Sequence, residues 1–210
     1  MLERIIRRLQ ASSLADTVIV ATSMAAEDDS VDRLGHDTGA LVFRGSESDV
    51  LDRYYQCART YDLDQIVRAT GDNPFVDPEA CDSLIQMFID QSLDYASAFP
   101  EFGSGFPIGI GVEIFTIAAL ERSWADGQAP HHREHVNEFI HENPDLFRQG
   151  VLHALPDKHA PTQSFTVDTH DQFAWAESLV HLWRNTGNDG EPSTKWLINN
   201  WHHRDSRSAS

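Results

Sequence analysis

The stretch Val67-Arg-Ala-Thr-Gly-Asp-Asn-Pro74 carries most of the information about the fold. It lies in an apolar, β-branched run, so we expect a buried strand over Gln65–Thr70. Gly71 and the acidic Asp72 follow that strand, at the end where open α/β sheets bind their ligands. The glycine lets the backbone approach a ligand closely. The segment therefore predicts a ligand site at a sheet edge, although an Asp at this position also suits an ordinary turn.

Short apolar runs and helical patterns alternate along the rest of the chain. Further strands are expected over Thr17–Thr22, Ala40–Arg44, Asp94–Ala98 and Val112–Thr116, and a strand pair over Val151–Leu155 and Ser164–Asp168. Helices are expected over Leu2–Leu9, from a cap at Ser46 or Ser48 to about Tyr61, after Pro78, and over Ile117–Ala125, Glu134–Glu142, Gln172–Asn185 and Ser193–Trp201, followed by a frayed tail over Arg204–Ser210. This order predicts βαβ units, an α/β Rossmann-like fold and a mainly parallel sheet.

The first helical pattern, Leu2–Leu9, has no strand before it. In a doubly wound domain the opening strand usually lies in the middle of the sheet, and the turn after it binds nucleotide phosphates. We therefore expect the first strand and its phosphate-binding loop to be missing from this sequence.

The amino-acid composition excludes some classes of binding partner. The 210 residues carry a formal net charge of −17, and such a surface repels nucleic acids and anionic membranes. A bound divalent cation and a few arginines still allow a small anionic ligand. No apolar run reaches the ~18–20 residues of a membrane span, and Cys57 and Cys81 have no metal-binding spacing. We expect a cytoplasmic protein with two reduced, buried thiols, and a homodimer is the default oligomeric state.

A second acidic strand end occurs in Phe165-Thr-Val-Asp-Thr-His-Asp171, where Asp168 follows a β-branched run. An ordinary helix cap is the simpler interpretation, because Asp and Thr are preferred there for local reasons. The pair favours a ligand role, since Asp72 and Asp168 suit the carboxylate ligands of one Mg²⁺ ion.

Two basic segments are further candidates. Arg44 ends a strand on the expected ligand edge, where it suits a phosphate or a base, whereas Asp52 and Arg53 on a helix are more often surface charges. In His131-His-Arg-Glu-His135, a zinc site lacks a third ligand at suitable spacing. We prefer a helix start that presents Arg133 and His135 to an anionic or polyhydroxyl ligand.

Taken together, these segments resemble the cytidylyltransferases that make CMP-activated acidic sugars. The opening helix "Met-Leu-Glu-Arg-Ile-Ile-Arg-Arg-Leu" is similar to the family's first helix. The branch called spore-coat polysaccharide biosynthesis protein F, related to CMP-KDO and CMP-acylneuraminate synthetases, has segments similar to "Phe-Arg-Gly-Ser-Glu-Ser-Asp-Val-Leu-Asp-Arg-Tyr-Tyr", "Val-Arg-Ala-Thr-Gly-Asp-Asn-Pro-Phe-Val-Asp-Pro", "Arg-Glu-His-Val" and "Val-Asp-Thr-His-Asp-Gln-Phe" in this order.

The resemblance implies a nucleotide-diphospho-sugar transferase fold and a reaction between CTP and a small sugar acid that needs Mg²⁺. It places the residues in three sets: Asp72 and Asp168 as catalytic metal ligands; Arg44, Asp52, Arg53, Arg68 and Gly71 near the nucleotide; and Glu113, Arg133 and His135 near the sugar. We expect a nucleotidyltransferase-like domain over 1–185, and a C-terminal helix and tail over 186–210.

Two departures from the family pattern leave the function open. Nothing matches the family's loop of the kind Ala-Arg-x-x-Ser-x-Arg-Leu-Pro-x-Lys, so we expect impaired activity. Gly111 also stands where the branch often has Asp. The alternatives are a non-catalytic, degenerate subunit and a glycosyltransferase of the same fold, although the Asp-x-Asp metal motif usual in that group is missing.

Overall fold

The computed structural model describes residues 1–204, which form strands and helices in a mixed α/β order. The strands are β1 (Ile19–Ser23), β2 (Leu41–Gly45), β3 (Gln65–Arg68), β4 (Tyr95–Ser97), β5 (Glu113–Thr116) and β6 (Gln149–Val151). The helices are α1 (Leu2–Leu9), α2 (Asp29–Asp37), α3 (Val50–Thr60), α4 (Pro78–Asp90), α5 (Ile117–Asp126), α6 (Pro130–Glu134), α7 (Glu138–Glu142), α8 (His170–Asn185) and α9 (Thr194–Asn200).

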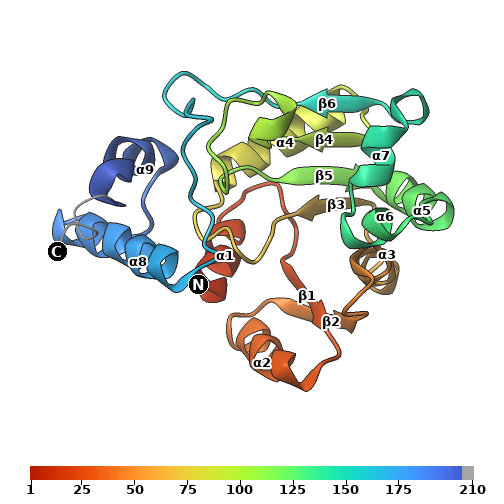
Figure 1. The fold of residues 1–210 in the computed structure, drawn as a ribbon, viewed down its shortest axis with the longest axis horizontal. Helices are drawn as coiled ribbons and strands as arrows, with labels where there is room; N and C mark the ends of the chain where they lie inside the picture. The colour runs from red at the N-terminus through yellow and green to blue at the C-terminus, as the bar shows by residue number, and fades with distance from the viewer. Residues whose placement is uncertain (205–210) are drawn as a thin grey trace.

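The described strands form two separate sheets. One contains β1 and β2, and the other has the order β3-β5-β4-β6 (Figure 1). Parallel pairing, as expected, joins β1 to β2 and β4 to β6, whereas β5 runs antiparallel to both β3 and β4. The structure therefore confirms an α/β fold with parallel elements and makes its larger sheet mixed.

Local capping explains where several helices begin. The Asp49 side chain accepts a hydrogen bond from the backbone N–H of Asp52 and caps α3, rather than the expected Ser46 or Ser48. Thr169 and Gln172 form a capping box at the start of α8. That box fixes the chain direction next to one of the two predicted metal ligands.

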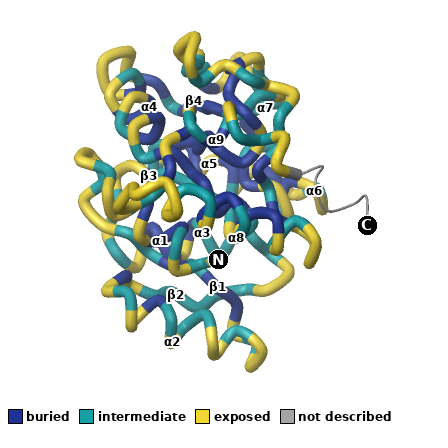
Figure 2. The backbone as a smooth tube through the Cα atoms, turned by 90° about the vertical axis from the view of Figure 1, so that its left-hand side faces the viewer, coloured by how far each residue is buried: buried dark blue, intermediate teal, exposed yellow. Residues whose placement is uncertain are grey.

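The main core lies around the four-stranded sheet. It combines residues of α4 and α8 with strand residues, including Leu84, Ile114, Phe165 and Leu179, which are fully buried. The smaller sheet has a much smaller core of three buried residues, Ile6, Val20 and Ala40. In Figure 2 the dark blue, buried backbone accordingly gathers in the middle, and α2 is mostly teal and yellow.

Three expectations need correction or qualification. The predicted strand pair over residues 151–155 and 164–168 is wrong: β6 pairs with β4, and Ser164 makes only an isolated bridge to Ile108. The predicted helix over residues 134–142 is divided into α6 and α7, because His135 adopts an extended backbone. The predicted tail falls mostly on residues 205–210, which lie outside the described part of the chain.

The C-terminal helix α9 packs on the main core instead of extending away from it. Leu197 is fully buried, and the Thr194 hydroxyl donates to the Asp77 carboxylate at 2.7 Å. The Trp201 indole N–H donates to the Ser164 carbonyl at 3.2 Å. A domain boundary at residue 186 stays a prediction. Within residues 1–204, none of the helices has the length and apolar character needed to cross a membrane.

Candidate functional site

The turn after β3 and the segment before α8 lie side by side, although almost one hundred residues separate them. The backbone N–H of Val167 donates to the carbonyl of Asp72 at 2.9 Å. The Thr166 hydroxyl donates to the Asn73 side-chain oxygen at 3.0 Å. These bonds place the backbone of Asp72 next to Val167, the residue that precedes Asp168.

Glycine at position 109 makes this contact possible. A Cβ on Gly109 would lie 2.9 Å from the Asn73 side chain and from Thr166, and its φ of +84° disfavours any other residue. Gly71 differs, because a Cβ there would meet no atom within 4 Å. The space beside Gly71 is therefore open, whereas Gly109 has a packing role that sequence reasoning missed.

Both carboxylates are held on fixed backbone but are open to solvent. The Thr70 hydroxyl donates to one carboxylate oxygen of Asp72, which is partly exposed. The exposed Asp168 has its backbone N–H bonded at 2.7 Å to the side chain of Gln172, in the capping box of α8. Two such oxygen donors at one sheet edge match the hard ligands that Mg²⁺ prefers.

Glu113 occupies a different environment, inside the sheet next to this edge. It lies on β5 opposite Arg68 of β3, and its side chain is fully buried. One carboxylate oxygen pairs with the Arg68 guanidinium, and the other accepts from the Tyr95 hydroxyl at 2.6 Å. Both oxygens of Glu113 are therefore already bonded within the protein.

The neighbours of Glu113 show how strongly this cluster is coupled. Burial, and then the charge of Glu113, raise the pKa of Tyr95 above its usual range. Burial favours a lower pKa for Arg68, but the Glu113 carboxylate raises it. The Arg68 guanidinium also lies over the Tyr54 ring, 5.8 Å from its centroid. The Arg68 guanidinium therefore points into a buried, charged cluster, which we call the Glu113 cluster (Arg68, Tyr95, Glu113).

His141 extends this cluster toward the surface. A ring nitrogen of His141 lies 3.2 Å from the Tyr95 hydroxyl, and its ring stacks on Phe102 with centroids 4.1 Å apart. Burial lowers the pKa of His141. Sequence reasoning missed Tyr95 and His141, because neither residue stands in a local motif and both meet Glu113 only through tertiary packing.

The predicted nucleotide residues on β2 and α3 make contacts within the protein. Arg44 bonds the carbonyls of Ser23 and Ala25 at 2.8 and 2.6 Å, and its guanidinium pairs with Asp29. Arg53 lines a hollow of about 310 Å³ at the end of β1, and also donates to the Ser46 carbonyl. The Asp52 carboxylate accepts from the Trp124 indole at 2.8 Å. Arg53 is thus the member of this group with a cavity beside it.

The residues expected near the sugar lie in different environments. Arg133 pairs with Asp49 at 2.7 Å and donates to the Trp124 carbonyl at 2.8 Å, which ties α6 to the start of α3. His135 is exposed just after α6, and Glu113 is buried as described above. Their role toward a sugar stays a prediction.

A histidine cluster lies between α6 and α7, but its members differ from the expected pair. Nε2 of His131 and Nε2 of His132 lie 2.7 and 2.6 Å from the two carboxylate oxygens of Glu142. Nδ1 of His132 faces the backbone N–H of Ala129 at 3.3 Å, so it is the acceptor nitrogen and Nε2 carries the hydrogen. A metal-bound His132 would need the opposite tautomer. The cluster therefore fits hydrogen bonding better than metal binding.

Known proteins with similar sequences identify the family of this chain. The family described as cytidylyltransferase matches residues 1–187. The spore coat polysaccharide biosynthesis protein SpsF of Bacillus subtilis is 32% identical over 203 residues, which cover 94% of this chain and 81% of that protein. The uncharacterized protein MJ1063 of Methanocaldococcus jannaschii is 37% identical over 175 residues, covering 82% of this chain and 69% of that protein.

Solved structures agree with the fold. A cytidylyltransferase from Leptospira borgpetersenii superposes with a TM-score of 0.84 at 25% identity, over 98% of this chain and 86% of its own. A CMP:2-keto-3-deoxy-manno-octonic acid synthetase, solved with CTP, superposes with a TM-score of 0.60 at 17% identity, over 88% of each chain. The nucleotide-diphospho-sugar transferase fold is thereby confirmed, and the chain belongs to the cytidylyltransferase family.

Proposed function

We propose that this protein transfers a cytidylyl group from CTP to a hydroxyl group of a sugar acid and releases pyrophosphate. The observation that carries the proposal is the convergence of Asp72 and Asp168 at the carboxyl end of β3. Membership of the cytidylyltransferase family supports the nucleotide, and the likeness to SpsF and to a synthetase solved with CTP supports an acidic sugar as acceptor.

We assign Mg²⁺ to Asp72 and Asp168. Their donor set fits, because both offer carboxylate oxygens open to solvent, and Mg²⁺ keeps several waters when only one or two carboxylates hold it. When bound, the ion neutralises phosphate charge and orients the triphosphate. The residues of the chain provide the position: the Thr70 hydroxyl donates to the side chain of Asp72, and the backbone N–H of Asp168 donates to the Gln172 side-chain oxygen.

The proposed step is an in-line displacement at the α-phosphorus of CTP. The sugar hydroxyl oxygen forms the new bond to phosphorus and releases its proton to solvent water, and the bond from phosphorus to the pyrophosphate oxygen breaks, so that pyrophosphate leaves. Gly71 leaves open space for the nucleotide, and Arg53 lies at a cavity at the end of β1, in the smaller sheet. Glu113 acts as a positioning residue, because its two oxygens already hold Arg68 and Tyr95.

Two measurements test this function. The first is the melting temperature with CTP and MgCl₂, because a ligand that binds only the folded state stabilises it by mass action. The second is pyrophosphate release from CTP with 2-keto-3-deoxy-manno-octonic acid as the probe acceptor. We expect CTP with Mg²⁺, but not UDP-glucose, to raise the melting temperature, and Asp72→Asn to abolish most of that rise.

A matched control is Asp90→Asn, which removes an exposed carboxylate at the far end of α4 and should leave the CTP effect intact. Equal stabilisation of the wild type and Asp72→Asn by CTP and Mg²⁺ would remove the basis for the metal assignment. No stabilisation by CTP at any concentration, and no pyrophosphate, would favour a non-catalytic subunit instead.

A further inference from the structure

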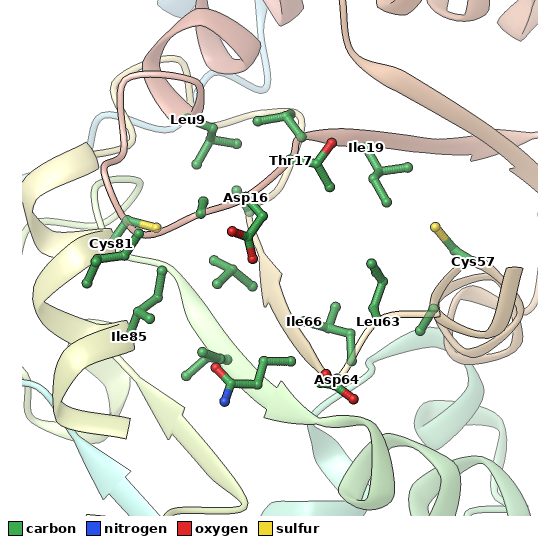
Figure 3. Close-up of a pocket in the computed structure, with 18 of the residues that line it drawn as sticks. Leu9, Asp16, Thr17, Ile19, Cys57, Leu63, Asp64, Ile66, Cys81 and Ile85 are labelled. Carbon is green, nitrogen blue, oxygen red and sulfur yellow. The ribbon is translucent and has the colours of Figure 1, made fainter. Parts of the chain in front are cut away.

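The two sheets are separated by a cavity of about 490 Å³ (Figure 3). We call it the interstrand cavity. Its walls come from β1 and β3, with α3 on one side and the end of α1 and α4 on the other. Among its lining residues are Ile19, Ala21, Cys57, Ile66, Val67 and Ile85. Burial raises the pKa of Cys57 to about 11, in agreement with an apolar wall.

One wall of the interstrand cavity is an edge of β3 that pairs with no other strand within residues 1–204. β3 pairs with β5 in antiparallel register, and the Ile117 N–H donates to the Asp64 carbonyl at 2.9 Å. In an antiparallel ladder, bonded residues alternate with residues whose N–H and C=O point to the other side. The backbone groups of Gln65 and Val67 therefore face away from β5, and both residues line the cavity.

The opposite wall is an unpaired edge of β1. β1 pairs with β2 in parallel register, and the Leu41 N–H donates to the Val18 carbonyl at 3.0 Å. The alternate residues Ile19 and Ala21 then direct their N–H and C=O groups away from β2, and both line the same cavity. The interstrand cavity is thus bordered on both sides by backbone groups that are able to form a sheet ladder.

We infer that the interstrand cavity accepts an extended polypeptide strand, an apolar segment of about five residues, matching β1 in length, with a basic end. The strand pairs with β1 on one side and β3 on the other and joins the two sheets into one. Its apolar side chains meet the apolar wall, and its basic end meets Asp16, Asp62 and Asp64, three exposed carboxylates that also line the cavity.

Three further observations favour a strand over a small molecule. Unpaired backbone edges on both sides offer more hydrogen bonds than one compact ligand satisfies, and a strand satisfies them in a regular ladder. The superposition on the solved cytidylyltransferase from Leptospira covers 98% of this chain with a TM-score of 0.84, but only 86% of that protein's own chain. The chain spans 69% of the length of its relative MJ1063, so relatives have additional segments.

The first experiment measures amide hydrogen exchange of the 210-residue protein with a synthetic peptide. The probe is Lys-Thr-Val-Ile-Val-Ala-Thr-Lys, blocked at both ends, which carries the sequence of Thr17–Thr22 between two lysines. We expect exchange at Ile19, Ala21, Gln65 and Val67 to slow by about tenfold or more. The control peptide has Pro in place of its central Ile, which removes a ladder donor, and should protect much less.

A variant pair tests the pairing itself. Gln65→Pro removes a cavity-facing N–H at the first position of β3, where Pro is tolerated and the ladder to β5 is unaffected. We expect it to weaken peptide binding by about tenfold, whereas the control Gln65→Ala keeps the donor and should bind normally. Far-UV circular dichroism and the melting temperature without peptide show that both variants are folded.

The outcomes that overturn the inference are distinct from a failure of the proposed function, because no readout uses nucleotide. If the peptide does not slow exchange, or if the Pro peptide slows it equally, the interstrand cavity does not pair with a strand. The cavity would then bind a compact apolar ligand or have no binding role. Protection of the same four amides that grows with protein concentration, without peptide, would mean that a second copy of this chain pairs there.

Discussion

The Asp72–Asp168 edge and the Glu113 cluster lie on neighbouring parts of one sheet, yet they treat acidic side chains in opposite ways. Asp72 is partly exposed and Asp168 is exposed, and the Asp72 carboxylate accepts a bond from a hydroxyl group. Glu113 has no exposed surface and bonds a guanidinium and a phenol. Solvated carboxylates are available to a ligand, whereas a buried paired carboxylate is committed to the fold.

Acidic residues that are close together in the fold can therefore have different roles, one in stability and the other in ligand binding. Removing one partner of a buried ion pair leaves the other charge without compensation. Removing an exposed carboxylate changes the fold little but takes away a metal ligand. Substitutions in the Glu113 cluster should therefore change stability most, and substitutions at Asp72 and Asp168 should change activity most.

Glu113→Ala should lower the free energy of unfolding by about 3–5 kcal/mol, because Arg68 would keep its charge in a buried position without a partner. Urea denaturation followed by circular dichroism measures this. Glu113→Gln is the matched variant, since its amide oxygen still accepts from Tyr95, and it should cost less. A loss below about 1 kcal/mol for Glu113→Ala would mean that Glu113 contributes no more to stability than an exposed carboxylate does.

Asp168→Asn should reduce Mg²⁺-dependent pyrophosphate release by about 10²-fold or more while leaving the urea midpoint almost unchanged. The reason is that the side chain is exposed and its removal affects a ligand oxygen instead of a packing contact. Asp171→Asn is the control, because this neighbouring carboxylate is also exposed, in the first turn of α8. Equal losses of activity in both variants would indicate a general charge effect.

Asp77→Asn should lower the free energy of unfolding at neutral pH by about 1–3 kcal/mol, since Asp77 caps α4 and bonds Lys158 at 2.6 Å. Burial favours a raised pKa for Asp77, but the hydrogen bond and charge of Lys158 hold it below its usual value. The folded-state pKa is then below the unfolded value of about 3.9.

The sign of the pH dependence follows from that order. The contribution of Asp77 is fully present above the unfolded pKa and is lost as the pH falls through the folded pKa. Wild type should therefore lose stability more steeply than Asp77→Asn below about pH 4. Urea midpoints at a series of acidic pH values measure this, and parallel curves for the two proteins would contradict the assignment.

Glu142→Gln should have the smallest effect on stability, because the carboxylate that binds His131 and His132 is exposed. Hydrogen bonds from His132 and His131 lower the pKa of Glu142, so their contribution is lost only as the pH falls through that lowered value. The test is the urea midpoint at neutral pH, which should not differ measurably from that of the wild type. A large shift would mean that the contacts of Glu142 with His131 and His132 stabilise the fold as strongly as the Glu113 cluster does.

Much of the local structure could be predicted from the sequence. β3 was expected over Gln65–Thr70 and extends over Gln65–Arg68, and α8 was expected over Gln172–Asn185 and extends over His170–Asn185. Apolar periodicity and capping residues specify such elements because they depend on neighbours a few residues away. The position of Asp72 after β3 was also readable from this local pattern, whereas Asp168 follows an irregular segment and not the expected strand.

The partners of the strands could not be predicted in the same way. The strand pair over residues 151–155 and 164–168 was wrong, and the opposition of Arg68 and Glu113 across β3 and β5 was not foreseen. Periodicity states which face of a strand is buried, but the neighbour of a strand depends on long-range packing.

The sequence by itself determined the α/β class, most of the elements and the acidic residue Asp72 after β3. The tertiary structure decided that Asp72 and Asp168 meet through Val167, that Glu113 is enclosed with Arg68, and that β1 and β3 face each other unpaired. The physical reason is range: capping and periodicity act within one element, whereas pairing and burial of a charge require the whole core to assemble.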